Sequence, residues 1–263
     1  GMGGYSSFPM CVAAKILRIP FVIYENNLFL GKTNRYLLPF SKKLLVAYGE
    51  LQGVNKKYFK KIIRVGNIIR EDILNYVKED YNKVSLKQLR ILVLGGSQAA
   101  RSFAEKLPKI FELCKSENID LKIYQQCLLN QKETLKEKYD LLNIESEIFD
   151  FSNNLLDYFS KTDVAITRSG SSMLAELLNC KIPIISVPLP SSADNHQFKN
   201  ARYFKEKGYG FLVEENMIDQ KLFQLIKSIH KDKDLINQMK SNQNTHSNKN
   251  VFTLINELII KII

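Results

Sequence analysis

Residues 168–176 read Arg-Ser-Gly-Ser-Ser-Met-Leu-Ala-Glu, a composition typical of a turn that enters a helix. A β-branched run at residues 163–166 predicts a buried strand before the turn, and residues 173–180 predict a helix after it. The start of a helix presents free backbone N–H groups and the positive end of its dipole, which suit phosphate. Glu176 adds a carboxylate that can accept hydrogen bonds from sugar hydroxyls. The alternative is an ordinary helix cap followed by a solvated acid.

A second turn of this kind lies upstream. Residues 89–94 predict a buried strand that leads into Gly95-Gly96-Ser97, and residues 103–114 predict a helix. Glycine lets the backbone approach a phosphate closely, and Ser97 supplies a hydroxyl donor. The stretch matches neither a complete P-loop nor a complete G-x-G-x-x-G motif. Two such turns in one chain favour a nucleotide or sugar-phosphate ligand.

Other polar residues follow predicted strands or open predicted helices. Asn27 follows a strand at residues 20–24, and His196 and Gln197 open a helix that ends near Gly208. Because carboxyl ends of parallel strands share one edge of a sheet, these side chains are expected on the same edge. Arg70 is a fixed positive charge at a predicted interdomain cleft. The ordinary alternatives are a cap or surface role for His196 and a surface role for Arg70.

Alternating strands and helices predict an α/β fold with doubly wound parallel sheets. We expect three parts: residues 1–67, residues 68–249 and a final helix within residues 250–263. The first part is too short to complete a sheet of its own, and the chain begins at Gly1, so we expect missing N-terminal sequence. Helices at residues 219–229 and 251–263 are predicted to end the chain, with an Asn- and Ser-rich hinge at residues 241–250 between them.

Composition is that of an ordinary globular protein, with 45% hydrophobic and 25% charged residues among 263. The net charge of +11 favours anionic partners. Basic and aromatic residues are not interleaved as in base-stacking proteins, which argues against nucleic acid. The four cysteines lack metal-type spacing and are predicted to be reduced and buried. No apolar run approaches the roughly 20 residues that span a bilayer.

Six short motifs, in order and spacing, resemble the MurG family, which transfers N-acetylglucosamine to lipid I to give lipid II. They are Met2-Gly3-Gly4-Tyr5, Glu25-Asn26-Asn27, Val65-Gly66-Asn67, Gly95-Gly96-Ser97-Gln98, Arg168-Ser169-Gly170 and His196-Gln197. The resemblance covers nearly the whole chain and implies a GT-B fold, in which two Rossmann-like domains face each other across a cleft. It implies inverting transfer from UDP-N-acetylglucosamine, with no metal and no cofactor.

The resemblance also implies the residues that bind the donor. Arg70 and Ser97 would lie near its diphosphate, and the turn at residues 151–152 would hold uracil through its backbone. Residues 171–176 would bind diphosphate and ribose, and Asn27, from across the cleft, would contact the sugar with His196 and Gln197. The full set is Asn27, Arg70, Ser97, Phe151, Ser152, Ser171, Ser172, Met173, Leu174, Ala175, Glu176, His196 and Gln197.

The implied partners are undecaprenyl-linked lipid I and the membrane, with the protein peripheral on the cytoplasmic face of the bacterial inner membrane. The family's N-terminal glycine-rich loop, with its histidine, is absent from this sequence, and the catalytic base stays unassigned. Other departures from the family pattern are Asn26, Ile68, Ala99, His196 and Gln125-Gln126-Cys127. Alternative hypotheses are a UDP-N-acetylglucosamine 2-epimerase, a non-catalytic nucleotide-sugar-binding fragment and a basic nucleic-acid binder.

Overall fold

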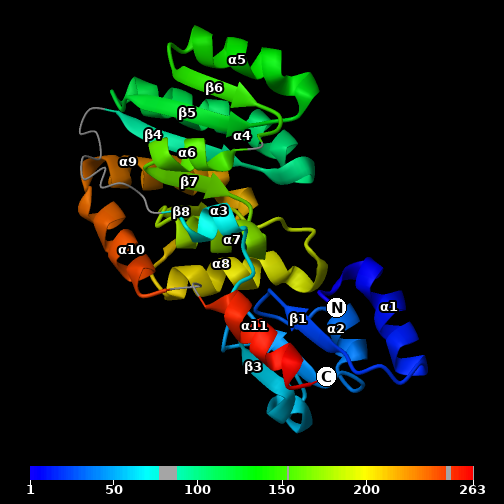
Figure 1. Ribbon diagram of the computed structural model, residues 1–263. Coiled ribbons are helices and arrows are strands. Elements are labelled where there is room, and N and C mark those ends of the chain that lie inside the picture. Colours follow the sequence, from blue (N-terminus) through cyan, green and yellow to red (C-terminus); the bar gives the residue numbers. More distant parts are fainter. Residues whose placement is uncertain (77–87, 153, 247–249, 263) are drawn as a thin grey trace.

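The computed structural model describes residues 1–76, 88–152, 154–246 and 250–262, apart from the side chains of Tyr5 and residues 97–100 (Figure 1). These residues form a three-stranded and a six-stranded parallel sheet, which we call the sheets of the first and second lobes. The first contains β1 (Val22–Glu25), β2 (Lys43–Val46) and β3 (Ile62–Arg64). The second contains β4 (Leu89–Leu94), β5 (Leu121–Gln126), β6 (Glu145–Phe149), β7 (Val164–Thr167), β8 (Ile184–Ser186) and β9 (Gly210–Leu212).

Helices connect and cover these strands. They are α1 (Gly4–Ile16), α2 (Lys32–Leu37), α3 (Glu71–Leu74), α4 (Gly96–Ser116), α5 (Lys132–Leu141), α6 (Leu155–Lys161), α7 (Ser171–Asn179), α8 (His196–Glu206), α9 (Phe223–Lys231), α10 (Asp234–Asn244) and α11 (Val251–Ile260). In the first lobe, Ile23, Leu44 and Val46 alternate along their strands and pack with Cys11 of α1 and Leu37 of α2. The predicted α/β class is therefore confirmed.

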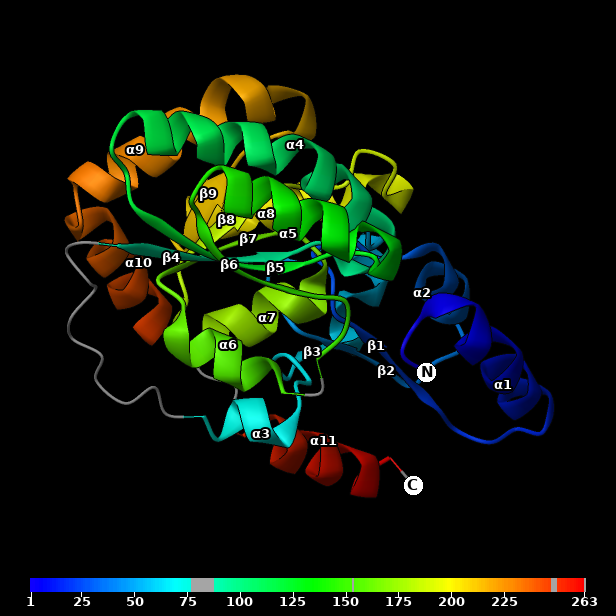
Figure 2. The ribbon, with the colours of Figure 1, turned by 90° about the horizontal axis from the view of Figure 1, so that it is seen from above.

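The second lobe is a doubly wound sheet with strand order β6-β5-β4-β7-β8-β9. Helices α4, α5 and α9 cover one face, and α6 and α7 lie on the other (Figure 2). Near-continuous apolar strands such as β4 fit a sheet that is buried on both faces.

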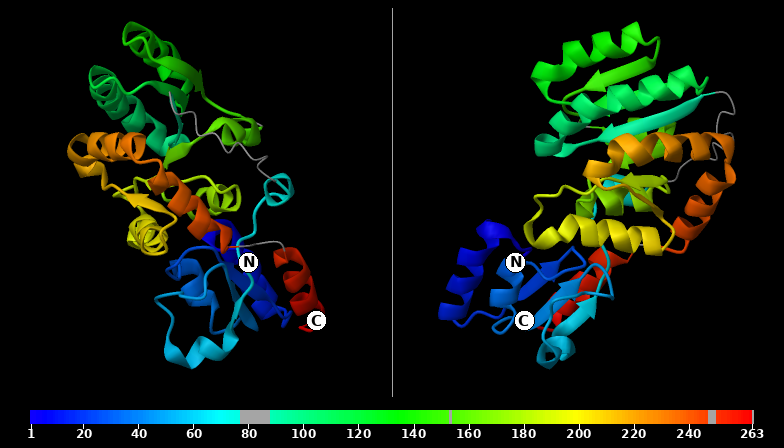
Figure 3. Two further views of the ribbon diagram at one scale, coloured as in Figure 1. Left: turned by 90° about the vertical axis from the view of Figure 1, so that its left-hand side faces the viewer. Right: turned by 180° about the vertical axis from the view of Figure 1, so that it is seen from behind.

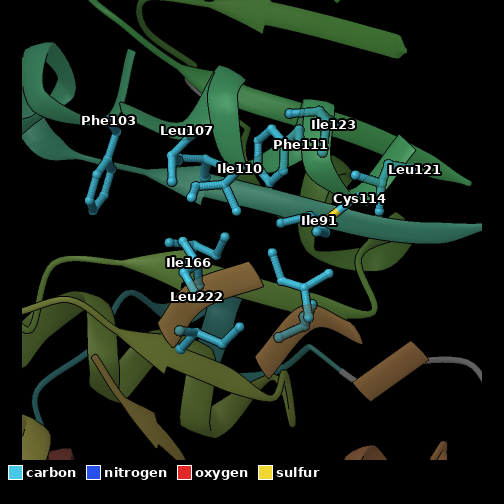
Figure 4. Close-up of a cluster of buried hydrophobic side chains, with 14 of the residues drawn as sticks. Ile91, Phe103, Leu107, Ile110, Phe111, Cys114, Leu121, Ile123, Ile166 and Leu222 are labelled. Atoms are coloured by element: carbon cyan, nitrogen blue, oxygen red, sulfur yellow. The ribbon is translucent and has the colours of Figure 1, made fainter. Parts of the chain in front are cut away.

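Helix α4 is held on the sheet by an apolar stripe. Its residues Phe103, Leu107 and Phe111 are each 0% exposed and belong to one buried cluster with strand residues Ile91 and Ile123 (Figure 4). Burial of one such side chain stabilises the fold by roughly 1.5–3 kcal/mol. This packing fixes where the N-terminus of α4 points, and that terminus follows the Gly95-Gly96 turn.

The predicted extents of the helix after β4 and of the hinge were wrong. Helix α4 begins at Gly96 instead of residue 103, so Ser97 lies in its first turn. Helix α10 occupies part of the predicted hinge, because Ile236, Met239 and Gln243 share one buried face within a polar sequence. Outside the described residues lie 247–249 of that hinge, 77–87 before β4, and Ile263.

The two lobes meet along α8. The ring of Tyr48, after β2, packs edge-on against Tyr203 with centroids 5.3 Å apart, and Lys207 pairs with Glu50 at 2.9 Å. Helix α11 returns to the first lobe and lies beside its sheet (Figures 1 and 3). All four cysteines are free and buried, as predicted. Within the described residues, no helix has the length and apolarity to cross a membrane.

Candidate functional site

The strand order reverses between β4 and β7, the two central neighbours of the larger sheet. Ligands of open parallel sheets bind outside the carboxyl ends of the strands at such a switch point. Arg168 N–H and Thr167 Oγ1 both donate to the Leu94 carbonyl, at 3.3 and 3.1 Å. The two turns singled out in the sequence are therefore neighbours.

The Gly95-Gly96 turn is tied to the loop after β6. Gly96 has a φ of +66°, which favours glycine, and a Cβ there would meet nothing within 4 Å. Its N–H donates to Gln126 Oε1 at 3.3 Å, and Gln126 Nε2 donates to the Asp150 carbonyl at 3.2 Å. Gln126, one of the departures from the family pattern, thus aligns the loops that follow β4 and β6.

The predicted uracil turn comes directly after Asp150. Phe151 is 72% exposed, and Ser152 Oγ accepts a hydrogen bond of 3.1 Å from the Asn154 N–H at the start of α6. The ring of Phe151 is thus available for stacking beside a fixed turn. The side chain of Ser97 lies outside the described part of the chain, but its backbone lies in the first turn of α4.

Helix α7 begins at Ser171, two residues earlier than predicted. The Leu174 N–H is already bonded to the Gly170 carbonyl at 3.1 Å, so the N–H groups of residues 171–173 are those left free at the helix start. Ser172 is exposed and Met173 half-buried. Leu174 and Ala175 are 0% and 1% exposed, so their side chains pack in the core and do not face a ligand.

Arg70 and Glu176 come together although 106 residues separate them in the sequence. Arg70 caps α3, and its Nε lies 3.9 Å from Glu176 Oε1 and 3.7 Å from Asp72 Oδ1. The Glu176 side chain is 14% exposed. Burial raises the pKa of its carboxyl, the Arg70 charge lowers it in part, and Asp72 raises it slightly. A cation and an acid suited to phosphate and hydroxyl groups therefore share one location.

The loop after β1 contacts the start of α7 from the first lobe. Ser171 Oγ donates a hydrogen bond to the Asn26 carbonyl. The buried Glu25 carboxylate accepts four bonds from this loop and the helix that follows it: from the N–H and Nδ2 of Asn27, at 3.1 and 3.0 Å, and from Gly31 N–H and Asn34 Nδ2 of α2, both at 2.9 Å. Glu25 therefore fixes the conformation of the loop that bears Asn27.

His196 and Gln197 open α8, as predicted, but both already have partners. His196 Nδ1 lies 2.7 Å from the Ala193 carbonyl. Gln197 Oε1 accepts bonds from the Ser169 and Leu189 N–H groups, at 3.2 and 3.0 Å. Gln197 thus joins the loops that follow β7 and β8, and its Nε2 is the atom left for a ligand.

Arg168 is buried beneath the β7 turn and interacts with Glu215. Its Nη1 donates to Glu215 Oε2 at 2.8 Å, and Ser102 Oγ donates to Oε1 at 2.6 Å. Although burial alone raises the pKa of Glu215, these bonds and the Arg168 charge keep it below its usual value. The guanidinium carbon of Arg168 lies 4.5 Å from the ring centre of Phe103 on α4. Arg168 therefore connects the turn after β7 with the helix that follows the Gly95-Gly96 turn.

Comparison with known proteins identifies the family. The model of the glycosyltransferase family 28 C-terminal domain matches residues 90–255. A curated Pelagibacter ubique protein, named UDP-N-acetylglucosamine--N-acetylmuramyl-(pentapeptide) pyrophosphoryl-undecaprenol N-acetylglucosamine transferase, is 36% identical over 99% of this chain and 72% of its own length. The chain belongs to this MurG family of glycosyltransferases.

Solved structures agree on the fold. The crystal structure of Acinetobacter baumannii MurG superposes with a TM-score of 0.81 over 99% of this chain and 73% of that chain, at 24% identity. A putative UDP-N-acetylglucosamine 2-epimerase from Listeria monocytogenes reaches a TM-score of 0.63 at 14% identity, over 98% and 72% of the two chains. The predicted GT-B fold is confirmed, and the epimerase is the weaker match.

In this MurG family member, sequence analysis missed Asn200 and gave Glu25 no role. Asn200 is 1% exposed and lies three residues after Gln197 on the same face of α8. The i, i+3 spacing of Gln197 and Asn200 was the feature of the sequence that could have indicated Asn200 as part of the site. A cavity of about 430 Å³ adjoins this helix, between Leu189, Phe198 and Glu215. It lies beside the loops that Gln197 joins.

Proposed function

We propose that this protein transfers N-acetylglucosamine from UDP-N-acetylglucosamine to the muramyl sugar of lipid I, giving lipid II in peptidoglycan synthesis. The observation that carries the proposal is the Arg70–Glu176 pair beside the start of α7, at the switch point of a MurG-family fold. The name of the Pelagibacter ubique relative supports the donor and the acceptor. We assign residues 68–249 to donor binding, and residues 1–67 with the helix in residues 250–263 to the acceptor-side domain.

The donor would lie along the carboxyl edge of the larger sheet. Uracil would stack near Phe151, and the ribose hydroxyls would donate to Glu176. The diphosphate would lie between Arg70 and the helix starts at Ser97 and Ser171. The N-acetylglucosamine would then reach Asn27 of the first lobe, with His196 and Gln197 of α8 on its other side. This order follows the strands from β6 across β4 and β7 to β8.

The reaction would invert the anomeric centre. A hydroxyl oxygen of the acceptor sugar forms a bond to the anomeric carbon as the bond from that carbon to the UDP phosphate oxygen breaks. The charge that develops on the diphosphate would be stabilised by Arg70 and by the N–H groups at the starts of α4 and α7. The hydroxyl proton passes to a base that we do not assign to a residue. No metal is invoked in this step.

Calorimetric titration with UDP-N-acetylglucosamine tests the proposal, with UDP-glucose as the control ligand. We expect selective binding of UDP-N-acetylglucosamine and at least about a tenfold loss of affinity in Glu176→Ala, because the ribose hydroxyls lose a charged acceptor. A folded protein that binds neither nucleotide sugar would refute the proposed donor site. Conversion of UDP-N-acetylglucosamine to its epimer without any lipid acceptor would favour the epimerase alternative.

We also propose that the protein is peripheral on the cytoplasmic face of the bacterial inner membrane. Apolar side chains of α1 and the segment after it are exposed: Met10 by 72%, Ile16 by 74% and Leu17 by 69%. Lys15 Nζ lies 3.1 Å from the ring centre of Phe40, which follows α2 and is 51% exposed. Apolar side chains beside basic ones suit an interface with anionic lipid.

Vesicle sedimentation tests the membrane proposal. With phosphatidylglycerol-containing vesicles, we expect Leu17→Asp to reduce the bound fraction several-fold, because a carboxylate resists transfer from water and is repelled by anionic lipid. Leu141→Asp is the matched control, since Leu141 is 82% exposed on α5 of the second lobe. Equal effects of the two substitutions would contradict an interface at α1.

A further inference from the structure

The Asn200 carboxamide joins the two lobes through three hydrogen bonds. Its Nδ2 donates to Asn27 Oδ1 and to the Ser169 carbonyl, both at 3.1 Å. Its Oδ1 accepts a bond of 3.2 Å from the Leu28 N–H. Both amide hydrogens and the oxygen are therefore used, and two of the three partners belong to the other lobe.

Asn200 and Gln197 together fix the backbone of Ser169. Gln197 Oε1 accepts from the Ser169 N–H, and Asn200 Nδ2 donates to the Ser169 carbonyl. Both backbone polar groups of Ser169 are thus satisfied by side chains from one face of α8. Because the bond from the Ser169 N–H to Gln197 is independent of Asn200, Ser169 and the start of α7 two residues later stay anchored when Asn200 is replaced.

Asn200 also leaves Asn27 with one way to bind a ligand. Asn27 Nδ2 donates to Glu25 Oε1 and to Asn26 Oδ1, at 3.0 and 3.1 Å, so both of its hydrogens are used. Asn27 Oδ1 accepts from Asn200, which leaves one lone pair free. A ligand hydroxyl that donates to this oxygen therefore meets an acceptor whose direction is set by Asn200 together with Glu25 and Asn26.

We propose that Asn200 is a positioning residue that makes the site selective for the sugar-bearing nucleotide over the bare nucleotide. It would do so by orienting Asn27 Oδ1 toward a sugar hydroxyl of the donor. This inference rests on the proposed donor. The uridine and diphosphate that UDP shares with the donor would be held by Glu176, Arg70 and the helix starts, so UDP binding is expected to be largely insensitive to the contact between Asn200 and Asn27.

The test compares the affinities for UDP-N-acetylglucosamine and UDP in Asn200→Ala and Asn200→Asp, by calorimetry on the whole chain. We expect about a tenfold weaker affinity for UDP-N-acetylglucosamine and less than about a twofold change for UDP. Asn200→Asp keeps the acceptor for Leu28 but replaces the donor with a carboxylate that faces two oxygens. Thermal melting confirms that each variant is folded, and Asn200→Ser replaces any that is not.

Asn179→Ala is the matched control. Asn179 Nδ2 also donates from a helix to a backbone carbonyl, that of Ile73, at 2.7 Å, but away from the proposed sugar position. We expect its ratio of the two affinities to match that of the unsubstituted protein. If the unsubstituted protein binds both nucleotides and the folded Asn200 variants keep its ratio, the inference is overturned and the proposed function stands. If the folded, unsubstituted protein binds neither nucleotide, the proposed function itself fails.

Discussion

Two carboxylates near the junction of the lobes, Glu25 and Glu176, have opposite surroundings. Glu25 is 4% exposed, and its two oxygens accept four hydrogen bonds from N–H groups of its own loop and of α2. The Glu176 side chain is 14% exposed, yet the described residues donate no hydrogen bond to it, and Arg70 approaches only to 3.9 Å. Both oxygens of Glu25 accept hydrogen bonds from the protein. Glu176 is largely shielded from water but accepts no hydrogen bond from the described residues in its place.

The difference separates a structural acid from an acid available to a ligand. Burial without hydrogen bonds disfavours the ionised form, which is why the pKa of Glu176 is raised. A ligand that brings hydroxyl donors would supply the missing hydrogen bonds. A buried position alone does not distinguish the two roles, but the count of donors around each carboxylate does.

Stability measurements test this contrast most strongly. We expect Glu25→Ala to lower the free energy of unfolding by about 3 kcal/mol, because it leaves buried N–H groups without an acceptor. Glu176→Ala is expected to change it by less than about 1 kcal/mol. Urea denaturation of both variants provides the comparison. Losses of equal size would show that the two acids have the same role.

The pH dependence of stability tests the contrast with a smaller effect. The folded-state pKa of Glu176 lies above its ordinary value of 4.5, so its contribution to stability is complete below that value. The contribution is lost as the pH rises through the raised pKa. We therefore expect the free energy of unfolding to fall less from about pH 4 to about pH 7 in Glu176→Gln than in the unsubstituted protein. The Arg70 charge lowers the pKa of Glu176 and so makes this difference smaller. An equal loss of stability in the two proteins would show that folding does not raise the pKa of Glu176.

The sequence was sufficient for the positions of the turns, because strand and helix periodicity places every βα turn on one edge of a parallel sheet. The glycine at position 96 and the pair at residues 196–197 were found in this way. The start of α4 was predicted wrongly, because the glycines that suggested a longer turn lie at the beginning of the helix.

Contacts between distant segments were beyond sequence analysis. Asn27 and Asn200 are 173 residues apart, and neither neighbourhood indicates that the two amides meet. The segment at residues 171–176 shows the same limit within one helix. Ser171 contacts the other lobe, whereas Leu174 and Ala175 pack in the core, a division set by tertiary packing.

The path of the chain has a mechanical consequence. It leaves the first lobe near Ile69, builds the second lobe, and returns after α10 so that α11 lies beside the first sheet (Figure 3). The lobes are therefore connected by two covalent crossings instead of one. Cleavage of the chain at the first crossing would leave the lobes joined only by packing, along α8 and through α11, whereas cleavage at the second would leave them covalently joined.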